Sequence, residues 1–137
     1  MGSFSNTSET AILDHIVGKT SFTMPTTVAV ALCTADPTDA GTGASCSECA
    51  NTNAYARKDT VGGDWNAAAA GATANANDLT FPEATGSWGE VTHFCLCDSA
   101  SYGAGDMLAH AQLGASKTIG SGDTPKFAAG DLDLTLD

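Results

Sequence analysis

The chain opens with a segment of helical periodicity. Asn6 and Glu9 form a capping-box pattern, and Gly18 is suited to end a helix in the left-handed conformation. Between them runs one apolar stripe at helical spacing, made of Ile12, Leu13, Ile16 and Val17. The pattern predicts a helix over residues 5–18, with His15 partly buried beside the stripe.

From residue 27 onward the spacing of apolar residues becomes two, which predicts β-strands. Residues 27–34 place Val28, Val30 and Leu32 on one face. Residues 90–97 give the most regular strand, with Val91, His93, Cys95 and Cys97 on one face and Thr92, Phe94 and Leu96 on the other. Because both faces of that strand are mostly apolar, we expect it at the centre of a sheet. Shorter strands are expected at residues 55–61, 79–82, 107–113 and 131–137, the last with a buried Leu face and a solvated acidic face.

Two stretches interrupt the strands. Residues 36–54 contain no large apolar side chain and predict a long exposed loop, while residues 66–77 are rich in Ala and Asn and predict a closely packed strand or loop. Residues 86–89 predict a turn anchored by Trp88. One helix followed by several short strands predicts a mainly β fold, an antiparallel, jelly-roll-like β-sandwich over residues 27–137, within a single domain of residues 1–137.

Composition changes this picture by pointing to partners. Ile, Leu, Val and Phe account for only 22 of the 137 residues, which falls below the usual share for an independently folding domain. Such a thin core needs support from partner subunits, cross-links or metal. The formal net charge of −11 argues against binding to nucleic acid or to an anionic membrane surface. The sequence also shows no apolar run long enough to span a bilayer and no basic, then apolar, leader segment.

Five cysteines carry the most informative chemistry, and they leave three interpretations open. Structural disulfides drawn from Cys33, Cys46, Cys49, Cys95 and Cys97 are favoured, with the odd thiol free or bridged to another chain. A zinc site would use Cys46, Cys49, Cys95 and Cys97, with His93 as a further ligand. Buried free thiols would act as small hydrophobic side chains. A redox role for the Cys46-x-x-Cys49 motif is disfavoured, because its loop is acidic and contains no cation.

Catalytic motifs are not found. The Gly18-Lys19-Thr20 segment lacks the upstream glycine of a phosphate-binding loop, and no serine stands in a nucleophile elbow. His15, His93 and His110 show no paired spacing, and His93 is expected to be a hydrogen-bonded core histidine. The sequence therefore predicts no catalytic residue, no cofactor and, apart from the zinc alternative, no metal.

An alternative binding function rests on aromatic residues. Four side chains could act as stacking platforms for host surface glycans in a lectin-like receptor-binding module: Tyr55, Trp65, Trp88 and Tyr102. Anchoring of turns is the favoured role for the same residues.

Several short segments, in order along the chain, resemble a family of small structural proteins of tailed bacteriophages, usually labelled as tail-fibre proteins. They are residues 3–6, 12–15, 28–37, 79–82, 86–94 and 122–132, and the resemblance covers about residues 3–136. It implies a non-enzymatic virion component located in the tail fibre, the neck collar or the capsid decoration. Within the resemblance, Cys33, Cys95 and Cys97 replace small or apolar residues, which indicates added covalent reinforcement.

The same resemblance indicates the partners. We expect a homo-oligomer, with a trimer as the working hypothesis, that contacts other virion proteins and is assembled in the cytoplasm of the bacterial host. Many identical copies make a small interface strong through avidity, which suits a chain with so little core of its own.

Overall fold

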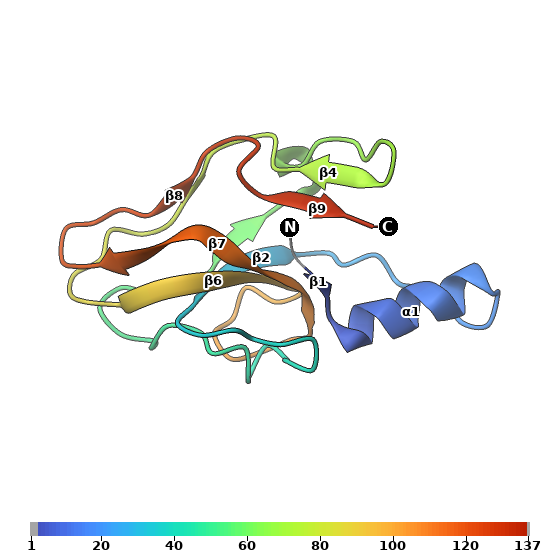
Figure 1. The fold of residues 1–137 in the computed structure, drawn as a ribbon, viewed down its shortest axis with the longest axis horizontal. Helices are drawn as coiled ribbons and strands as arrows, with labels where there is room; N and C mark the ends of the chain where they lie inside the picture. The colour runs from blue at the N-terminus through green and yellow to red at the C-terminus, as the bar shows by residue number, and fades with distance from the viewer. Residues whose placement is uncertain (1–2, 137) are drawn as a thin grey trace.

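The computed structural model describes residues 3–136, and its fold is mainly β with one helix near the N-terminus (Figure 1). The elements are β1 (Ser3–Phe4), α1 (Asn6–Ile16), β2 (Val28–Cys33), β3 (Lys58–Thr60), the 3₁₀ turn η1 (Gly62–Asp64), β4 (Ala72–Ala74), β5 (Leu79–Thr80), β6 (Gly89–Cys97), β7 (Met107–Ile119), β8 (Lys126–Phe127) and β9 (Asp133–Thr135). The predicted mainly β, antiparallel fold with one helix is thereby confirmed, and the jelly-roll-like arrangement stays a prediction.

The strands form one large sheet and two small ones. The large sheet has the order β1-β7-β6-β2-β3, and the small sheets pair β4 with β9 and β5 with β8. Every strand pair is antiparallel. The small sheets lie over one face of the large sheet, so the strands form two layers (Figure 1). The strand predicted to be most regular, β6, indeed lies at the centre.

The two central strands β2 and β6 present different side chains to their two faces. On β2, Val30 and Leu32 point into the main hydrophobic core beneath the small sheets, whereas Ala31 and Cys33 point the other way. We call the side of the sheet to which Val30 and Leu32 point the apolar face. Its buried core comprises Val30, Leu32, Cys49, Tyr55, Leu79, Phe81, Ala84, Trp88, Val91, Phe94, Leu96, Ala111, Ile119 and Leu132. We call the opposite side the thiol face, with a separate buried group of Ala31, Cys33, Cys46, Cys95, Cys97 and Met107.

One prediction for β6 fails because of a β-bulge. Strict alternation predicts Val91 on the same face as Cys95, but Val91 belongs to the core of the apolar face together with Phe94. The pairing with β7 shifts register between Val91 and His93, where β7 has four residues (113–116) opposite the single residue Thr92, and this irregularity places Val91 on the other side. From His93 to Cys97 the predicted alternation holds.

The helix differs from its prediction at its ends and in its environment. Its N-cap is Ser5 rather than Asn6, since the Ser5 side chain accepts a hydrogen bond from the backbone N–H of Ser8. The helix ends at Ile16, and Gly18 follows with φ of +74°, as a helix-stop glycine does. His15 is exposed rather than partly buried. Among the described residues no helix is both long and apolar enough to cross a membrane.

Two further expectations need correction. The loop over residues 36–54 is not wholly exposed, because Cys46 and Cys49 are buried within it. In the C-terminal run, Leu132 is buried as predicted, but Leu136 is 51% exposed. Asp137, which the predicted strand included, lies outside the described residues.

Candidate functional site

Strand geometry brings three of the five cysteines to one place. Cys95 and Cys97 lie two residues apart on β6, so their side chains point to the same face. Cys33 ends the neighbouring strand β2 and pairs with His93, which places it diagonally across from Cys95 on the thiol face. The fourth member, Cys46, comes from the loop that covers this face. We call these four residues the thiol cluster.

The sulfur atoms of the thiol cluster are close together and shielded from solvent. The Cys95 Sγ lies 3.7 Å from the Cys33 Sγ and 3.8 Å from the Cys97 Sγ. The sulfurs of Cys33, Cys46 and Cys95 all lie within 4.8 Å of one another. Each of the four residues is at most 1% exposed. The cluster is therefore closed, with no thiol open to a substrate.

The neighbouring thiols shift one another's pKa values in opposite directions. The neighbouring thiols of Cys33, Cys95 and Cys97 and the positive charge of Arg57 hold the pKa of the Cys46 thiol below its ordinary value. The pKa values of Cys95 and Cys97 are raised, since their protons are engaged in hydrogen bonds with neighbouring thiols and their thiolates would be buried. Three buried sulfurs this close together can act as ligands of a soft metal ion.

Cys49 has a different environment. It lies in the core of the apolar face, and burial raises the pKa of its thiol to about 11, reinforced by the negative charge of Glu48. The group of four therefore contains Cys33 in place of Cys49, unlike the predicted zinc combination. His93 also stays apart, with its Nδ1 bonded to the Thr92 hydroxyl at 2.9 Å. All five cysteines are free thiols in this structure, so the predicted disulfides stay a prediction.

A buried ion pair fixes the loop that supplies Cys46. The Arg57 guanidinium donates to both carboxylate oxygens of Glu48, at 2.9 and 2.8 Å, and the arginine side chain is fully buried. It also donates to the carbonyl oxygens of Gly43, Ser99 and Ala104. Arg57 thereby joins the loop to the β6–β7 turn. The backbones approach so closely there that a Cβ on Gly43 would collide with the Ala104 carbonyl oxygen.

Two other contacts hold the same loop. The Tyr55 hydroxyl donates to Glu48 at 2.7 Å and accepts from the backbone N–H of Leu32 at 3.1 Å, which links the ion pair to β2. At the start of the loop, His110 Nε2 lies 3.0 Å from an Asp39 carboxylate oxygen. That hydrogen bond lowers the pKa of Asp39. The loop is thus attached to the large sheet at both ends.

Sequence reasoning missed the Arg57–Glu48 pair. One usable signal is the alternation of Tyr55 and Arg57, which places both on one side of an extended segment. A second is the position of Glu48 between Cys46 and Cys49. If either cysteine is buried, the nearby glutamate is brought toward the interior as well. Neither signal identifies the partner, because the pairing depends on how the loop folds back.

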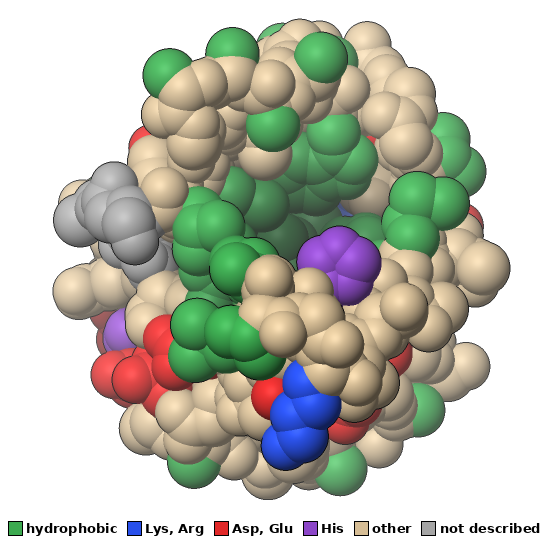
Figure 2. Space-filling view, turned by 90° about the vertical axis from the view of Figure 1, so that its right-hand side faces the viewer, with side chains coloured by type: hydrophobic (Ala, Val, Ile, Leu, Met, Phe, Trp, Pro, Cys, Tyr) green, Lys and Arg blue, Asp and Glu red, His purple; other side chains and the backbone are tan. Residues whose placement is uncertain are grey.

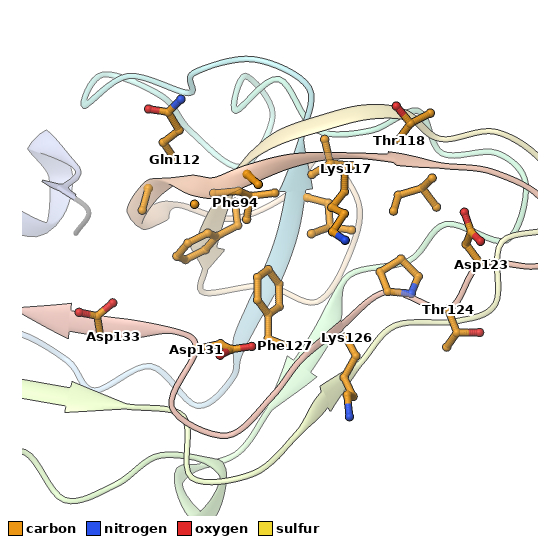
Figure 3. Close-up of a pocket in the computed structure, with 18 residues that line it drawn as sticks. Phe94, Gln112, Lys117, Thr118, Asp123, Thr124, Lys126, Phe127, Asp131 and Asp133 are labelled. Atoms are coloured by element: carbon orange, nitrogen blue, oxygen red, sulfur yellow. The ribbon is translucent and has the colours of Figure 1, made fainter.

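A groove opens between the two layers. Its volume is about 840 Å³, and Phe94 and Phe127 stand within it with ring centroids 5.6 Å apart (Figure 3). Lys117, Asp123 and Asp131 contribute charged side chains to its lining. Seen from the end of the molecule that carries α1, the surface is hollowed and hydrophobic side chains line the hollow (Figure 2).

The aromatic residues considered for glycan stacking are mostly occupied by the fold. Trp88 and Tyr55 are 5% and 4% exposed, and the Trp88 Nε1 donates to the Asn53 carbonyl at 2.9 Å, which confirms its role as a turn anchor. Trp65 is half-buried and donates to Thr60. Of the four, Tyr102 presents the most surface. Two of the four predicted platforms are therefore inaccessible to a glycan.

Exposed apolar side chains gather at α1 and the segment after it. Of the eight large hydrophobic residues exposed in the described chain, five form what we call the helix patch: Leu13, Ile16, Val17, Phe22 and Met24. Leu13 and Ile16 lie on α1 and Val17 is its C-cap, and their i, i+3, i+4 spacing places the three on one side of the helix. Phe22 is held beside the helix because its N–H donates to the His15 Nδ1. A patch of this kind marks an interaction surface.

Comparison with known proteins identifies the family. None of the curated proteins compared with this chain matches it. A family model described as podophage GP4 fiber I protein gp80 matches residues 3–135, nearly the whole chain. The resemblance expected from the sequence is thereby confirmed, and the chain belongs to this family of bacteriophage fibre structural proteins.

Proposed function

We propose that this chain is a non-enzymatic subunit of a bacteriophage fibre, built into the virion as several identical copies. The family match over residues 3–135 carries this proposal, since it names a fibre protein. Within the virion we assign the chain to the tail fibre rather than to the neck collar or the capsid decoration. Assembly is proposed to take place in the cytoplasm of the bacterial host, where virion proteins are made.

The helix patch supports self-association. Leu13, Ile16 and Val17 are 62%, 69% and 72% exposed, although they belong to the apolar stripe of α1 and its C-cap. A stripe of this kind normally faces a core. Since the helix extends beyond the strand layers (Figure 1), a second copy of this chain is the occupant that we propose for the stripe.

The charge of the chain favours the same surface. A net charge of −11 makes identical copies repel one another over most of their surfaces. An apolar contact between copies gains from burial of hydrocarbon and brings few carboxylates together. A trimer is the arrangement we propose, because cyclic symmetry closes such an assembly.

The test is the mass of the purified full chain in solution, measured by light scattering after size exclusion over a range of concentrations. The wild type is expected at the mass of three chains. The double variant Leu13→Gln/Ile16→Gln should run as a monomer with unchanged circular dichroism. Val61→Gln is the matched control, because Val61 is 68% exposed but lies outside the helix patch. A monomeric wild type at every concentration would refute the oligomer.

The location has a separate test. Electron microscopy of particles labelled with an antibody against this chain should place the label along the tail fibres. Label at the neck collar or over the capsid would contradict the fibre assignment and leave the oligomer proposal standing.

A further inference from the structure

We propose that the thiol cluster of Cys33, Cys46, Cys95 and Cys97 is a structural zinc site, in which one Zn²⁺ ion is held by four thiolates. This inference goes beyond the fibre function and does not depend on it. It concerns how the thiol face is closed in each copy.

The spacing of the sulfurs fits the geometry of such a site. Zn–S bonds of about 2.3 Å in a tetrahedron place neighbouring sulfurs roughly 3.8 Å apart. The two sulfur pairs formed by Cys95 measure 3.7 and 3.8 Å. Cys46 completes the group from the loop, with its sulfur within 4.8 Å of those of Cys33 and Cys95. Cys97, whose sulfur lies beside that of Cys95, is the fourth ligand that we propose.

Disulfides explain the same arrangement less well. A bridge needs two sulfurs to approach to about 2.05 Å, and it selects one pair. Here the Cys95 sulfur lies 3.7 Å from that of Cys33 and 3.8 Å from that of Cys97, and neither distance is that of a bridge. Cys95 and Cys97 are also two residues apart on one extended strand, where a bridge between them is strained. A centre that takes all four sulfurs accounts for the arrangement.

The surroundings suit a structural ion. The four cysteines are buried together with Ala31 and Met107, and this leaves no position open to water or substrate, as is typical of closed tetrathiolate sites. One Zn²⁺ with four thiolates carries two negative charges, and the thiol protons pass to solvent on binding. The buried Arg57 guanidinium exerts its positive charge on Cys46 and Cys97, which compensates part of that charge. Zinc would thus connect β2, β6 and the covering loop.

The first experiment measures metal in the purified full chain, produced without chelator, by mass spectrometry of the elements. We expect about one zinc per chain. Cys46→Ala should lower the zinc content at least about tenfold, because a tetrathiolate site loses most of its affinity with one ligand. Cys49→Ala is the matched control: Cys49 is equally buried but lies outside the thiol cluster, so this variant should keep its zinc.

A second measurement uses the wild type alone, in case a variant fails to fold. After metal removal under reducing conditions, addition of Co²⁺ should produce thiolate-to-cobalt charge-transfer absorption and the visible bands of a tetrahedral site. Zn²⁺ should abolish both. A strong chelator should lower the melting temperature of the wild type and of Cys49→Ala, and leave that of Cys46→Ala unchanged.

Three results would overturn the proposal. One is a metal-free wild type whose mass shows disulfides among the four cysteines. Another is a metal-free wild type with reduced thiols and no cobalt spectrum. The third is iron in place of zinc in the purified chain. Because oligomer mass is measured on the same samples, a failure of the zinc proposal is distinguishable from a failure of the fibre proposal.

Discussion

The two faces of the central strands β2 and β6 are closed by different chemistry. On the apolar face, Val30 and Leu32 meet carbon side chains from the small sheets, such as Leu79 of β5. On the thiol face, Cys33 and Cys95 meet a loop that has no large apolar residue to offer. Neighbouring residues of one strand therefore stabilise the fold by different means.

The difference follows from what covers each face. The hydrophobic effect is non-directional and scales with the apolar area that is buried. The small sheets therefore need only present enough apolar surface. A polar loop cannot be held in that way. It is held instead by directional contacts, namely the Arg57–Glu48 pair and the sulfur of Cys46. We expect the thiol face to fail abruptly when one contact is removed, and the apolar face to weaken in proportion to the carbon lost.

The largest effect is expected from Arg57→Met on the thiol face. The change leaves the Glu48 carboxylate, with 5% of its side chain exposed, as an uncompensated buried charge. Removal of one partner from a buried pair costs about 3–5 kcal/mol of unfolding free energy, measurable by urea unfolding. Lys117→Met is the control, since Lys117 is exposed and its loss should stay within about 0.5 kcal/mol. Equal effects for the two variants would contradict the directional account.

Leu79→Ala tests the apolar face and should have the next largest effect. Leu79 is 1% exposed, and removing its buried carbons leaves a cavity that costs about 3 kcal/mol, within the range known for such changes. Leu136→Ala, at a half-exposed position, should cost about 0.5 kcal/mol or less in the same urea titration. The zinc content of Leu79→Ala should equal that of the wild type. Loss of metal in this variant would show that the two faces are not independent.

The smallest effect is expected from Lys126→Ala. This change removes the cation of an exposed ion pair, in contrast to the buried Arg57–Glu48 pair. Lys126 lies 2.9 Å from Asp78, with about half of each side chain exposed, and solvent screens their attraction. The melting temperature of the variant at neutral pH should fall by less than that of either variant above.

The pH range in which the Lys126–Asp78 pair stabilises the fold follows from the pKa shifts of its two members. The hydrogen bond with Lys126 lowers the pKa of Asp78, and the bond with Asp78 raises the pKa of Lys126. The contribution of Asp78 is present above its unfolded-state pKa of about 3.9 and is lost as the pH falls through the lower folded value. That of Lys126 is present below about pH 10.4 and is lost as the pH rises through the higher folded value. The difference between variant and wild type should therefore vanish in acid, and a difference that grows in acid would contradict this.

Local pattern was enough to predict some of these features. The alternation in β2 placed Val30 and Leu32 on one face, and the spacing of Cys95 and Cys97 placed both sulfurs on the other. These features depend on strand geometry, which has a fixed period of two. The fold class followed from the same pattern, and the family followed from ordered short motifs.

Features that depend on distant contacts were not predictable. The bulge that moves Val91 arises from pairing with β7, not from the β6 sequence. The choice of Cys46 over Cys49 for the thiol cluster depends on the path of the loop, which Arg57 and Glu48 determine through contacts across the fold. The helix stripe was visible in the sequence, but its exposure was not, because a periodic pattern does not say what lies opposite it.

The close approach at Gly43 has a consequence for how this family can diversify. A side chain at this position would collide with the facing turn, whereas Thr42 and Ala44 on either side are exposed. Gly62 and Gly63 have open space around them. Substitutions between phages should therefore accumulate at 42, 44, 62 and 63 while position 43 stays fixed. Peptide tags for display on the particle belong at residues 62–63.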